Sequence, residues 1–480
     1  MQPNWIDILP LIFLAGGGFL IFCLGGFWKG RPRGLLFGVA LVAAIAAGAA
    51  SVLFRPEQPQ FLQMVEVGGY GRFFTFLLTL ITTLSLLFSY QYVRLRGIGG
   101  DEFYGLLLLG GFGMILVASA LHWLVFFLGL ETLSLSLYVL IAIRKHQPAS
   151  SEAGLKYFMM GAVASAFLTF GIAMVYAATG KMDILQSLSA NTQAVSSPAM
   201  LLGLSLILIG IGFKVSMVPF HLWTPDVYQG APAPVTAFLA TGSKVALFSA
   251  LLRFAFYCAR NSVWNDYVFV FWILAFLTMA VGNLTALAQV RVKRLLAYSS
   301  VAQMGYLLMT TLAVREGGVS AIMFYLSVYA LMDLGAFGTL ATLSAEEKDI
   351  DDLENFRGLA YVHPWRSVLL TVCLVSLAGL PPTAGFMGKF ILFRAVIQAR
   401  FVVLAALGIV TVIVSIYFYF KIIVALFMQP MGEKPATPDL DIFARIAGIA
   451  VLVLILWLGL FPSPLLSVIA RILPFSLQQG

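Results

Sequence analysis

Long apolar runs constrain this sequence more than any other feature. A window reading finds about fourteen of them, most with about 20 residues or more, enough for a helix to cross a hydrocarbon core of roughly 30 Å. A backbone in lipid must satisfy its hydrogen bonds internally, and the runs are continuously apolar rather than alternating, so they favour helices and exclude a barrel. The predicted fold is therefore an all-α polytopic membrane protein.

Composition supports the same class. With 61% hydrophobic and only 10% charged residues, the chain differs from soluble proteins, in which about a quarter of the residues are charged. The first run has no basic region before it and no small-residue cleavage site after it, so we expect a retained helix rather than a signal peptide. The expected segments are residues 5–27, 34–54, 72–94, 103–120, 121–143, 155–179, 199–223, 232–258, 267–288, 294–313, 317–343, 366–396, 402–428 and 445–472.

Lysine and arginine concentrate in alternate loops, and this bias predicts the orientation. We expect the basic loops inside and both termini outside, on the periplasmic side of a bacterial inner membrane. The longest of these loops, 346–366, is acidic and then basic with aromatic residues, which suits the membrane surface or a partner, or equally a solvated connection. The loops expected inside are residues 29–34, 93–100, 143–156, 290–295 and 346–366.

Several ionisable residues lie within the predicted spans: Glu131, Lys214, Lys244, Asp333 and Lys389. Such a residue at mid-bilayer costs at least a few kcal/mol, so it usually faces a bundle interior or water and marks a functional path. Burial makes a lysine release its proton more readily, whereas a nearby carboxylate makes it hold the proton more tightly. A charge that moves toward or away from the lysine can therefore change its protonation state. We interpret the set as a proton path; the alternative is a buried ion pair of Glu131 with one lysine that only fixes helix packing.

Two further basic residues, Arg253 and Lys421, lie closer to the ends of their predicted helices. A long basic side chain near a helix end reaches the headgroups while its stem stays in the apolar layer. We therefore expect both to snorkel and to take no part in the path.

Proline interrupts two predicted segments, because it removes a backbone donor and opens the helix. The breaks fall at Pro219 and at Pro381–Pro382, with Lys214 and Lys389 nearby, and broken helices mark the ion sites of transporters. The two broken segments are five apart in the order of segments. Since five is odd, the count predicts two inverted five-helix repeats, each with one broken helix. The expected parts are a three-helix segment at 1–102, the first repeat at 103–258, the inverted second repeat at 267–428 and a C-terminal helix at 445–480.

Polar residues beside the path leave alternatives open. His221 follows the seventh segment on its inner side, where it would exchange protons with bulk water or act as a local hydrogen-bonding residue. The tenth segment has no counterpart of Glu131, but its polar residues would hold water between charged stations or form packing contacts. These residues are Tyr298, Ser299, Ser300 and Gln303.

The three cysteines have no paired spacing, so we infer neither a metal site nor a disulfide.

Three stretches carry a specific resemblance to a known family. They are "GFKVSMVPFHLWTPDVYQGAPAPVTAFLATGSKVALF" (212–248), "LLAYSSVAQMGY" (295–306) and "GLPPTAGFMGKF" (379–390). At these residues the chain closely resembles the antiporter-like membrane subunits of proton-pumping NADH-quinone oxidoreductase, respiratory complex I, which also resemble Mrp-type antiporter subunits. Lys389 and the chain length favour the subunit N branch, the relatives of mitochondrial NADH dehydrogenase subunit 2.

The resemblance implies roles for individual residues. Glu131 and Lys214 would pair in the first half-channel, Lys244 would be a central relay and Lys389 would serve the exit half-channel. Glu152 and Lys156 look like the family's acid and lysine at the start of the sixth helix, at the inner mouth, although the window reading alone places them among loop charges. Asp333 matches no family position with which we can align it.

The resemblance also implies what the chain binds. The subunit itself would hold no flavin, iron–sulfur cluster, nicotinamide or quinone, because these and NADH belong to partner subunits, and the sequence has no phosphate-binding glycine loop or cysteine cluster. The expected partners are the other membrane and peripheral subunits of complex I and the lipid bilayer, without nucleic acid. The alternatives are an Mrp-type cation/proton antiporter subunit and a structural subunit whose buried charges only hold helices together.

Overall fold

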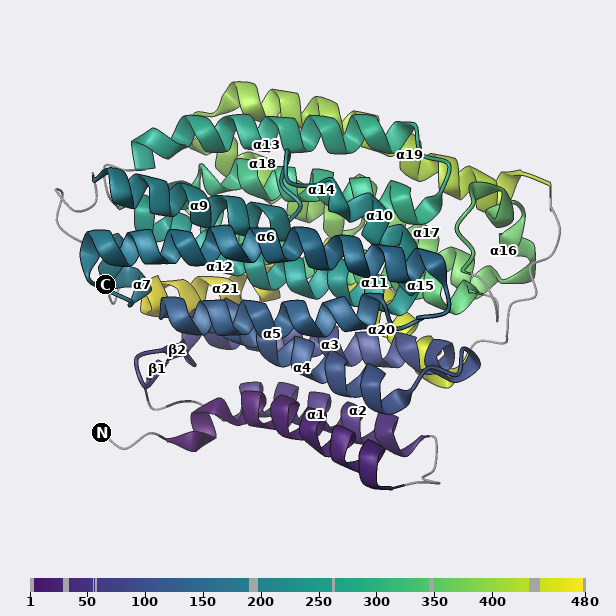
Figure 1. The fold of residues 1–480 in the computed structure, drawn as a ribbon. Coiled ribbons are helices and arrows are strands. Elements are labelled where there is room, and N and C mark those ends of the chain that lie inside the picture. The colour runs from purple at the N-terminus through teal and green to yellow at the C-terminus, as the bar shows by residue number, and fades with distance from the viewer. Residues whose placement is uncertain are drawn as a thin grey trace.

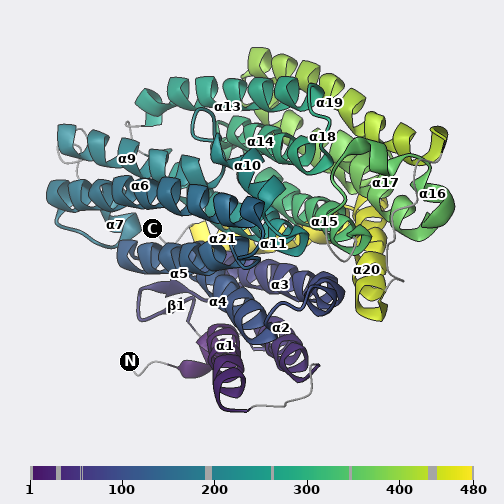
Figure 2. The same cartoon turned by 45° about the vertical axis from the view of Figure 1, so that its right-hand side comes forward.

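The computed structural model describes residues 4–28, 34–54, 56, 58–189, 197–260, 264–344, 349–430 and 441–477. Most of its long helices run along one common direction and pack side by side (Figures 1 and 2). Among the described residues, 11 helical stretches are long and apolar enough to cross a membrane. The prediction of an all-helical, multi-pass membrane protein is confirmed.

Most predicted segments correspond to one long helix or to helices joined end to end. The first run combines a short 3-10 turn, η1, with α1, and the eighth combines α11, the π-helical turn η2 and α12. The bounds are η1 (Trp5–Ile8), α1 (Leu9–Phe27), α2 (Leu35–Leu53), α3 (Gly69–Leu95), α4 (Gly100–Ser119), α5 (Trp123–Ile141), α6 (Pro148–Thr179), α11 (Ala233–Phe238), η2 (Leu239–Ser243), α12 (Lys244–Cys258), α13 (Trp264–Leu287), α14 (Val292–Thr311), η3 (Val314–Gly318), α15 (Val319–Leu343) and α19 (Val402–Met428).

The two segments expected to break at proline are indeed broken. The seventh consists of α9 (Pro198–Lys214) and α10 (Trp223–Gly230), and the twelfth of α17 (Pro364–Ala378) and α18 (Ala384–Gln398). In Figure 1, α10 lies to the right of α9, whereas α18 lies to the left of α17, so the two broken helices run in opposite directions.

The structure differs from the sequence prediction in three places. The fourteenth run is not one helix but two, α20 (Ile442–Leu460) and α21 (Ser463–Leu477), because Pro462 follows the first of them. Helix α6 begins at Pro148, so it includes residues that the window reading had placed in a loop. Short elements that give no hydropathy signal complete the chain: β1 (Gln60–Phe61), β2 (Val65–Glu66), α7 (Ile184–Leu188), η4 (Leu353–Phe356) and α16 (Leu359–Val362).

Some of the loops expected inside lie partly outside the described residues, namely 29–33 of the first and 346–348 of the last. The described loops at 93–100, 143–147 and 290–291 and the helix α16 lie together at the right-hand end in Figure 1. The β1–β2 hairpin and α7 lie at the opposite end. The alternation that the basic loops predicted is therefore present, while the side of the membrane to which each end belongs stays a prediction.

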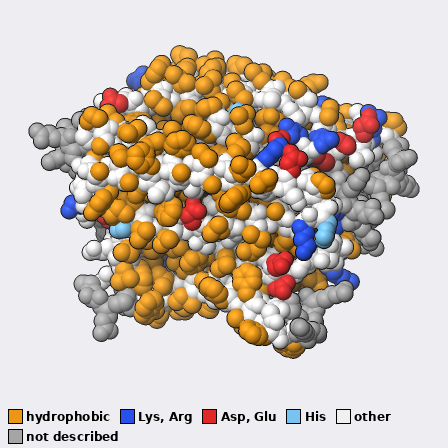
Figure 3. Space-filling model, viewed as in Figure 1, with side chains coloured by type: hydrophobic (Ala, Val, Ile, Leu, Met, Phe, Trp, Pro, Cys, Tyr) orange, Lys and Arg blue, Asp and Glu red, His pale blue; other side chains and the backbone are white. Residues whose placement is uncertain are grey.

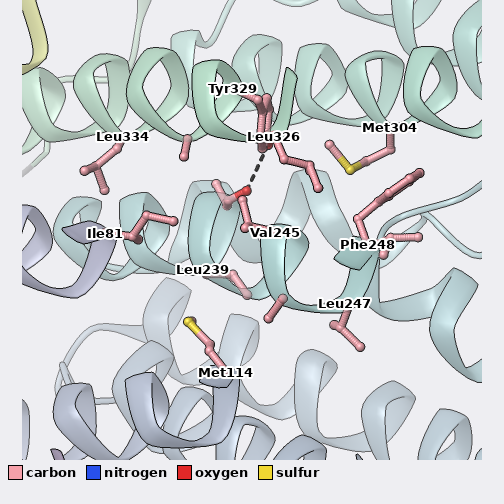
Figure 4. Close-up of a cluster of buried hydrophobic side chains, with 14 of the residues drawn as sticks. Ile81, Met114, Leu239, Val245, Leu247, Phe248, Met304, Leu326, Tyr329 and Leu334 are labelled. Atoms are coloured by element: carbon pink, nitrogen blue, oxygen red, sulfur yellow. Dashed lines mark hydrogen bonds between the residues drawn. The ribbon is translucent and has the colours of Figure 1, made fainter. Parts of the chain in front are cut away.

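The centre of the molecule is formed by the eighth and eleventh segments. In their most apolar windows, 100% of the stretch Ala233–Cys258 and 94% of Val314–Leu343 is buried, against 28% for the stretch that contains α1. Figure 4 shows part of this core, in which the eighth segment, with Leu239, Val245 and Phe248, lies between the helix of Leu326 and Tyr329 and the helix of Met114. Polar groups that act at the centre of this bundle are thus shielded from lipid.

The outer surface suits a lipid or protein environment. Hydrophobic side chains cover most of the face seen in Figure 3, and charged side chains gather toward its right-hand end. Helix α6 contributes a row of exposed apolar residues to the surface, including Phe158, Val163, Phe167 and Phe170. Since exposed apolar area of this extent is not stable in water, the surface agrees with a membrane protein.

Candidate functional site

Lys214 is the last residue of α9, at the edge of the first helix break, and it is only 3% exposed. Its Nζ donates to Ser134 Oγ on α5 at 2.8 Å. The same Nζ lies 4.9 Å from the ring centre of Tyr157 and 5.3 Å from that of Tyr138. The ring centre of Phe213 is 5.8 Å away. Since aromatic faces attract a cation, the ammonium is held by one neutral hydroxyl and three rings.

Glu131 lies on α5 one turn before Ser134, and its Oε1 accepts a hydrogen bond from Ser165 Oγ on α6 at 2.6 Å. Residues three apart share a helix face, so Glu131 and the hydroxyl that binds Lys214 lie on the same side of α5. The ion pairs found among the described residues do not include Glu131 with Lys214. The structure therefore brings these residues near one another without the direct contact that the resemblance implies.

Lys244 is completely buried at the start of α12, directly after the π-helical turn η2. Its Nζ donates to Ser300 Oγ on α14 at 2.6 Å and lies 5.4 Å from the ring centre of Tyr228. Single π-helical turns inside α-helices are rare and occur frequently at functional sites. Here the turn precedes Lys244, which is less exposed than Lys214 and Lys389.

Asp333, on the central helix α15, belongs to the network of Lys244. Ser300 Oγ is 2.6 Å from Tyr329 Oη, and that hydroxyl is 3.0 Å from Asp333 Oδ2 and 2.8 Å from the carbonyl oxygen of Ala240. The contact between Tyr329 and Ala240 is the dashed line in Figure 4. Asp333 is completely buried, and its Oδ1 has no hydrogen-bond partner in the described part of the chain. A lysine and a carboxylate are thus joined through two hydroxyl groups.

Lys389, on α18, is 4% exposed and lies beside the second helix break. Its Nζ donates to the carbonyl oxygens of Leu377 and Ala378, the last residues of α17, at 2.7 and 3.3 Å. The carboxyl end of a helix carries partial negative charge, which stabilises a cation there. Gly379 ends α17 in the left-handed region (φ 81°), and a Cβ at this position would lie 2.8 Å from the Cδ of Lys389. The break is therefore shaped around the lysine.

Polar residues of α14 continue from Lys389 into the core. The amide of Gln303 donates to the carbonyl oxygen of Leu377 at 3.3 Å, which is also the main acceptor for Lys389, and to Tyr419 Oη at 3.2 Å. Tyr419 is hydrogen-bonded to Ser299, and Tyr325 donates to the side-chain oxygen of Gln303. Of the polar residues expected in the tenth segment, Ser299 and Gln303 thus form direct side-chain links around the second break, whereas Ser300 binds Lys244 and Tyr298 lies near His221.

A surface cluster joins α6, α10 and α14. Lys156 Nζ lies 2.7 Å from Glu152 Oε1 and 2.9 Å from Asp226 Oδ2, and Arg294 Nη1 lies 2.6 Å from Asp226 Oδ1. All four side chains are partly or fully accessible to solvent. Glu152 and Lys156 lie within α6 rather than in a loop. Asp226 pairs with Lys156 and with Arg294, and so connects α6 with α14, a helix of the second half of the chain.

His221 lies in the first break and is buried. Its Nδ1 is shielded from solvent and has no hydrogen-bond partner among the described residues, and its ring centre is 6.5 Å from that of Tyr298 on α14. The hydrogen bonds of the described residues do not join His221 to Lys214, so the two share the break without direct contact.

The expectation that Arg253 snorkels is wrong. It is 3% exposed, its Nη2 lies 2.6 Å from Glu66 Oε2, and its Nη1 donates to the carbonyl oxygen of Ala120 at 2.7 Å. Arg253 thus fastens the β1–β2 hairpin and the α4–α5 connection to α12. Lys421, on α19, donates to the carbonyl oxygen of Gln289, just beyond the end of α13, at 3.1 Å. Its amine therefore binds the end of a neighbouring helix rather than the headgroups.

Sequence reasoning did not single out several residues that contact the charged groups, namely Ser134, Tyr138, Tyr157, Asp226, Tyr329 and Tyr419. Of these only Asp226 carried a usable signal, since it is an acid beside a predicted helix break. Within the described part of the chain, no group of three or more His, Cys, Asp or Glu side chains comes together as metal ligands would.

The sequence matches a family model described as NADH:quinone oxidoreductase/Mrp antiporter, TM, over residues 120–415, which contain both helix breaks and Lys214, Lys244 and Lys389. The chain belongs to this family. The match begins after α4 and ends within α19, so the N-terminal helices and α20 and α21 lie outside it.

Relatives within the family narrow this assignment. The chain is 46% identical to NADH-quinone oxidoreductase subunit N 1 of Solidesulfovibrio magneticus over 98% of this chain and 99% of that protein. It is 42% identical to NADH-quinone oxidoreductase subunit N of Geobacter metallireducens over 97% and 98% of the two chains. At this level of identity and coverage, the chain is a subunit N member of the family.

Solved structures agree with this placement. A chain of respiratory complex I from Thermus thermophilus with bound aureothin is 37% identical, has a TM-score of 0.81 and covers 95% of this chain and 98% of its own length. A chain of the Mrp complex from Dietzia sp. has a TM-score of 0.82 at 21% identity and covers 98% and 97% of the two chains. The second likeness concerns the fold alone, which this family shares with Mrp antiporters.

Proposed function

We propose that this chain is a proton-translocating membrane subunit of an NADH-quinone oxidoreductase, coupled to redox chemistry in partner subunits. The observation that carries the proposal is the set of buried lysines, Lys214, Lys244 and Lys389. Each amine contacts hydroxyl or carbonyl oxygens and aromatic faces rather than a carboxylate. A lysine bound in this way can lose and regain its proton without breaking an ion pair, which suits a relay better than a structural clamp.

The network around Lys244 offers a balanced proton transfer. Lys244 gives a proton to Ser300 Oγ, the Ser300 proton passes to Tyr329 Oη, and the Tyr329 proton passes to Asp333. The outcome is a neutral amine and a protonated carboxyl, with both hydroxyl groups restored. We place Asp333 in the relay on this basis, beside Lys214 with Glu131 on one side and Lys389 on the other.

We further propose that the halves 103–258 and 267–428 are inverted repeats, flanked by the N-terminal segment 1–102 and by a C-terminal part at 445–480. The opposite course of the two broken helices in Figure 1 supports this. The surface cluster of Glu152, Lys156 and Asp226 would form the inner mouth, with His221 between the mouth and Lys214. Both termini would then lie outside a bacterial inner membrane.

Partners and cofactors follow from the family. The named relatives are subunits of NADH-quinone oxidoreductase, so we assign this chain to a hetero-oligomer with the other membrane and peripheral subunits of complex I. NADH, flavin, iron–sulfur clusters and quinone would all bind in those partners and none in this chain. The alternative, an Mrp-type antiporter subunit, is favoured by the shared fold but not by the identity of the relatives.

The test compares Lys214→Ala and Lys389→Ala in the assembled complex. Proton uptake by reconstituted vesicles is measured together with quinone reduction and subunit content. We expect pumping and coupled quinone reduction to fall while assembly stays normal. Lys421→Ala is the matched control, because Lys421 contacts only a helix-end carbonyl among the described hydrogen bonds. Unchanged pumping in the first two variants would overturn the relay and favour a structural role.

Co-purification decides between the two assemblies. Isolation of the chain with NADH dehydrogenase subunits supports complex I. Isolation in an Mrp-like assembly that restores growth in high sodium would support the antiporter instead.

A further inference from the structure

A basic cavity lies between the first turns of α17 and α20, away from the line of lysines. Its volume is about 400 Å³, and it is lined by Val362, His363, Pro364, Trp365, Arg366, Arg445 and Ile449. The lining includes two arginines and a histidine but no carboxylate. Both α17 and α20 begin at this end. The carboxylate of Asp441 caps α20, whereas α17 has no side-chain cap, so the positive end of the α17 dipole adds to the charge of the arginines. The chemistry of the cavity therefore favours an anion.

The cavity lies where a membrane helix meets the headgroup layer. Trp365 lines it, and Tyr361 in the preceding helix α16 is largely exposed. Tryptophan and tyrosine concentrate at the membrane–water interface.

An apolar stripe leads from the cavity into the membrane. Ile446, Ile449, Val453 and Trp457 are all exposed on α20, and their spacing of three or four residues puts them on one face of the helix. Ile449 belongs both to the stripe and to the cavity lining. A soluble anion such as inorganic phosphate would leave the stripe exposed, whereas the acyl chains of a lipid would cover it.

We propose that this cavity binds the phosphodiester headgroup of an anionic glycerophospholipid, with the acyl chains along the exposed face of α20. Arg445, which is exposed, supplies the charge-assisted hydrogen bonds, because a guanidinium matches two phosphate oxygens at once, and the almost fully buried Arg366 adds its positive charge from the cavity wall. Basic pockets between membrane helices are a recurring site for acidic lipid headgroups. The site is separate from the proton path and does not depend on the function proposed above.

The experiment uses the full-length chain in its native membrane complex, purified in detergent and depleted of lipid. Dioleoyl phosphatidylglycerol, dioleoyl phosphatidylcholine and inorganic phosphate are titrated separately, and the melting temperature of the complex is followed. Arg445→Gln removes one charge from an exposed position and is therefore expected to fold. Arg471→Gln on α21 is the matched control, an exposed arginine that does not line the cavity.

We expect phosphatidylglycerol alone to raise the melting temperature of the unmodified complex and of Arg471→Gln. Arg445→Gln should need about tenfold more of this lipid for the same shift. Ile449→Trp, which fills the cavity and keeps both charges, should weaken the response as well. Equal responses of Arg445→Gln and Arg471→Gln would overturn the proposal. An equal effect of phosphatidylcholine would show that charge is not recognised, and an equal effect of phosphate would identify a site for free anions; either result also overturns it.

Discussion

The hydroxyl group of Tyr329 lies 3.0 Å from Oδ2 of Asp333, one turn along the same helix, and 2.8 Å from the carbonyl oxygen of Ala240. This hydroxyl has a single hydrogen for two acceptors. When it donates to Asp333, the connection from Lys244 through Ser300 is complete, and when it donates to Ala240, the connection is open. At Tyr329 the proposed transfer can therefore be interrupted without removal of a charge.

The first prediction is that Tyr329→Phe slows proton pumping by about tenfold or more. Loss of the hydroxyl removes the only described link between Ser300 and Asp333 and leaves buried polar groups unsatisfied, at about 1–3 kcal/mol each. Pumping is measured in vesicles and divided by subunit content. Tyr267→Phe is the control, since its hydroxyl binds Ser205 and the carbonyl oxygen of Leu201, outside the network. A Tyr329→Phe complex that pumps like the control would show that Asp333 is not in the path.

The second prediction concerns Ser134, whose hydroxyl group binds Lys214 from the face of α5 that also carries Glu131. Ser134→Ala should lower pumping several-fold, because the amine of Lys214 loses a 2.8 Å acceptor and keeps only aromatic faces nearby. Ser136→Ala on the same helix is the matched control. Its hydroxyl is also buried but binds the carbonyl oxygen of Thr132 in its own helix. If the two variants pump equally, Ser134 has no role in the transfer.

The helices were largely predictable, because a membrane span must be a long apolar helix whatever its neighbours are. The third run was expected at 72–94 and is helix α3, Gly69–Leu95. The start of α6 was missed because Glu152 and Lys156 lower the hydropathy of its first turns, although Pro148 at its first position is a start signal. The break between α20 and α21 was missed because Pro462 and Pro464 were averaged into an apolar window.

The charged residues of the site were also predictable, since a lysine or carboxylate in an apolar run is itself the signal. Their partners were not, because serine and tyrosine are common in membrane helices and the contacts join distant parts of the chain. Ser134 and Lys214 are 80 residues apart, and Lys244 and Ser300 are 56 apart. Arg253 was misread for the same reason: its position near a helix end was visible, but its partner Glu66 is 187 residues away.

The third prediction tests the buried pair of Arg253 and Glu66. Glu66→Gln keeps the shape of the side chain but leaves a buried guanidinium without its counter-charge, which costs about 3 kcal/mol or more. We expect a lower melting temperature and less assembled complex, with unchanged pumping per assembled complex. Glu354→Gln is the control, because Glu354 pairs with Arg357 on the surface and such pairs contribute about 1 kcal/mol or less. Reduced pumping per complex would instead connect the pair with the proton path.

A second buried ion cluster joins the loops at the opposite end of the molecule. Asp349 contacts Lys293, Arg96 Nη2 at 3.1 Å and Tyr92 Oη at 2.9 Å. The side chains of Lys293 and Arg96 are almost entirely buried. Burial raises the pKa of Asp349, but the attraction of Lys293 and Arg96 and the hydrogen bond from Tyr92 outweigh it and hold the pKa below its usual value. Asp349 therefore stabilises the fold only in its ionised form.

The fourth prediction is that Asp349→Asn lowers the free energy of unfolding at pH 7 by about 3 kcal/mol, because buried cations lose their counter-charge. An aspartate with a depressed pKa stabilises the folded state above its unfolded pKa of about 3.9, and this stabilisation is lost as the pH falls through the folded value. The difference in stability between the unmodified complex and Asp349→Asn should therefore be constant near neutral pH and shrink below about pH 4. Asp352→Asn, in the same loop and paired with exposed Arg291, should change stability by about 1 kcal/mol or less. Denaturation of the purified complex at a series of pH values measures both, and a difference that persisted unchanged below the folded pKa of Asp349 would mean that its charge is not what ties these loops together.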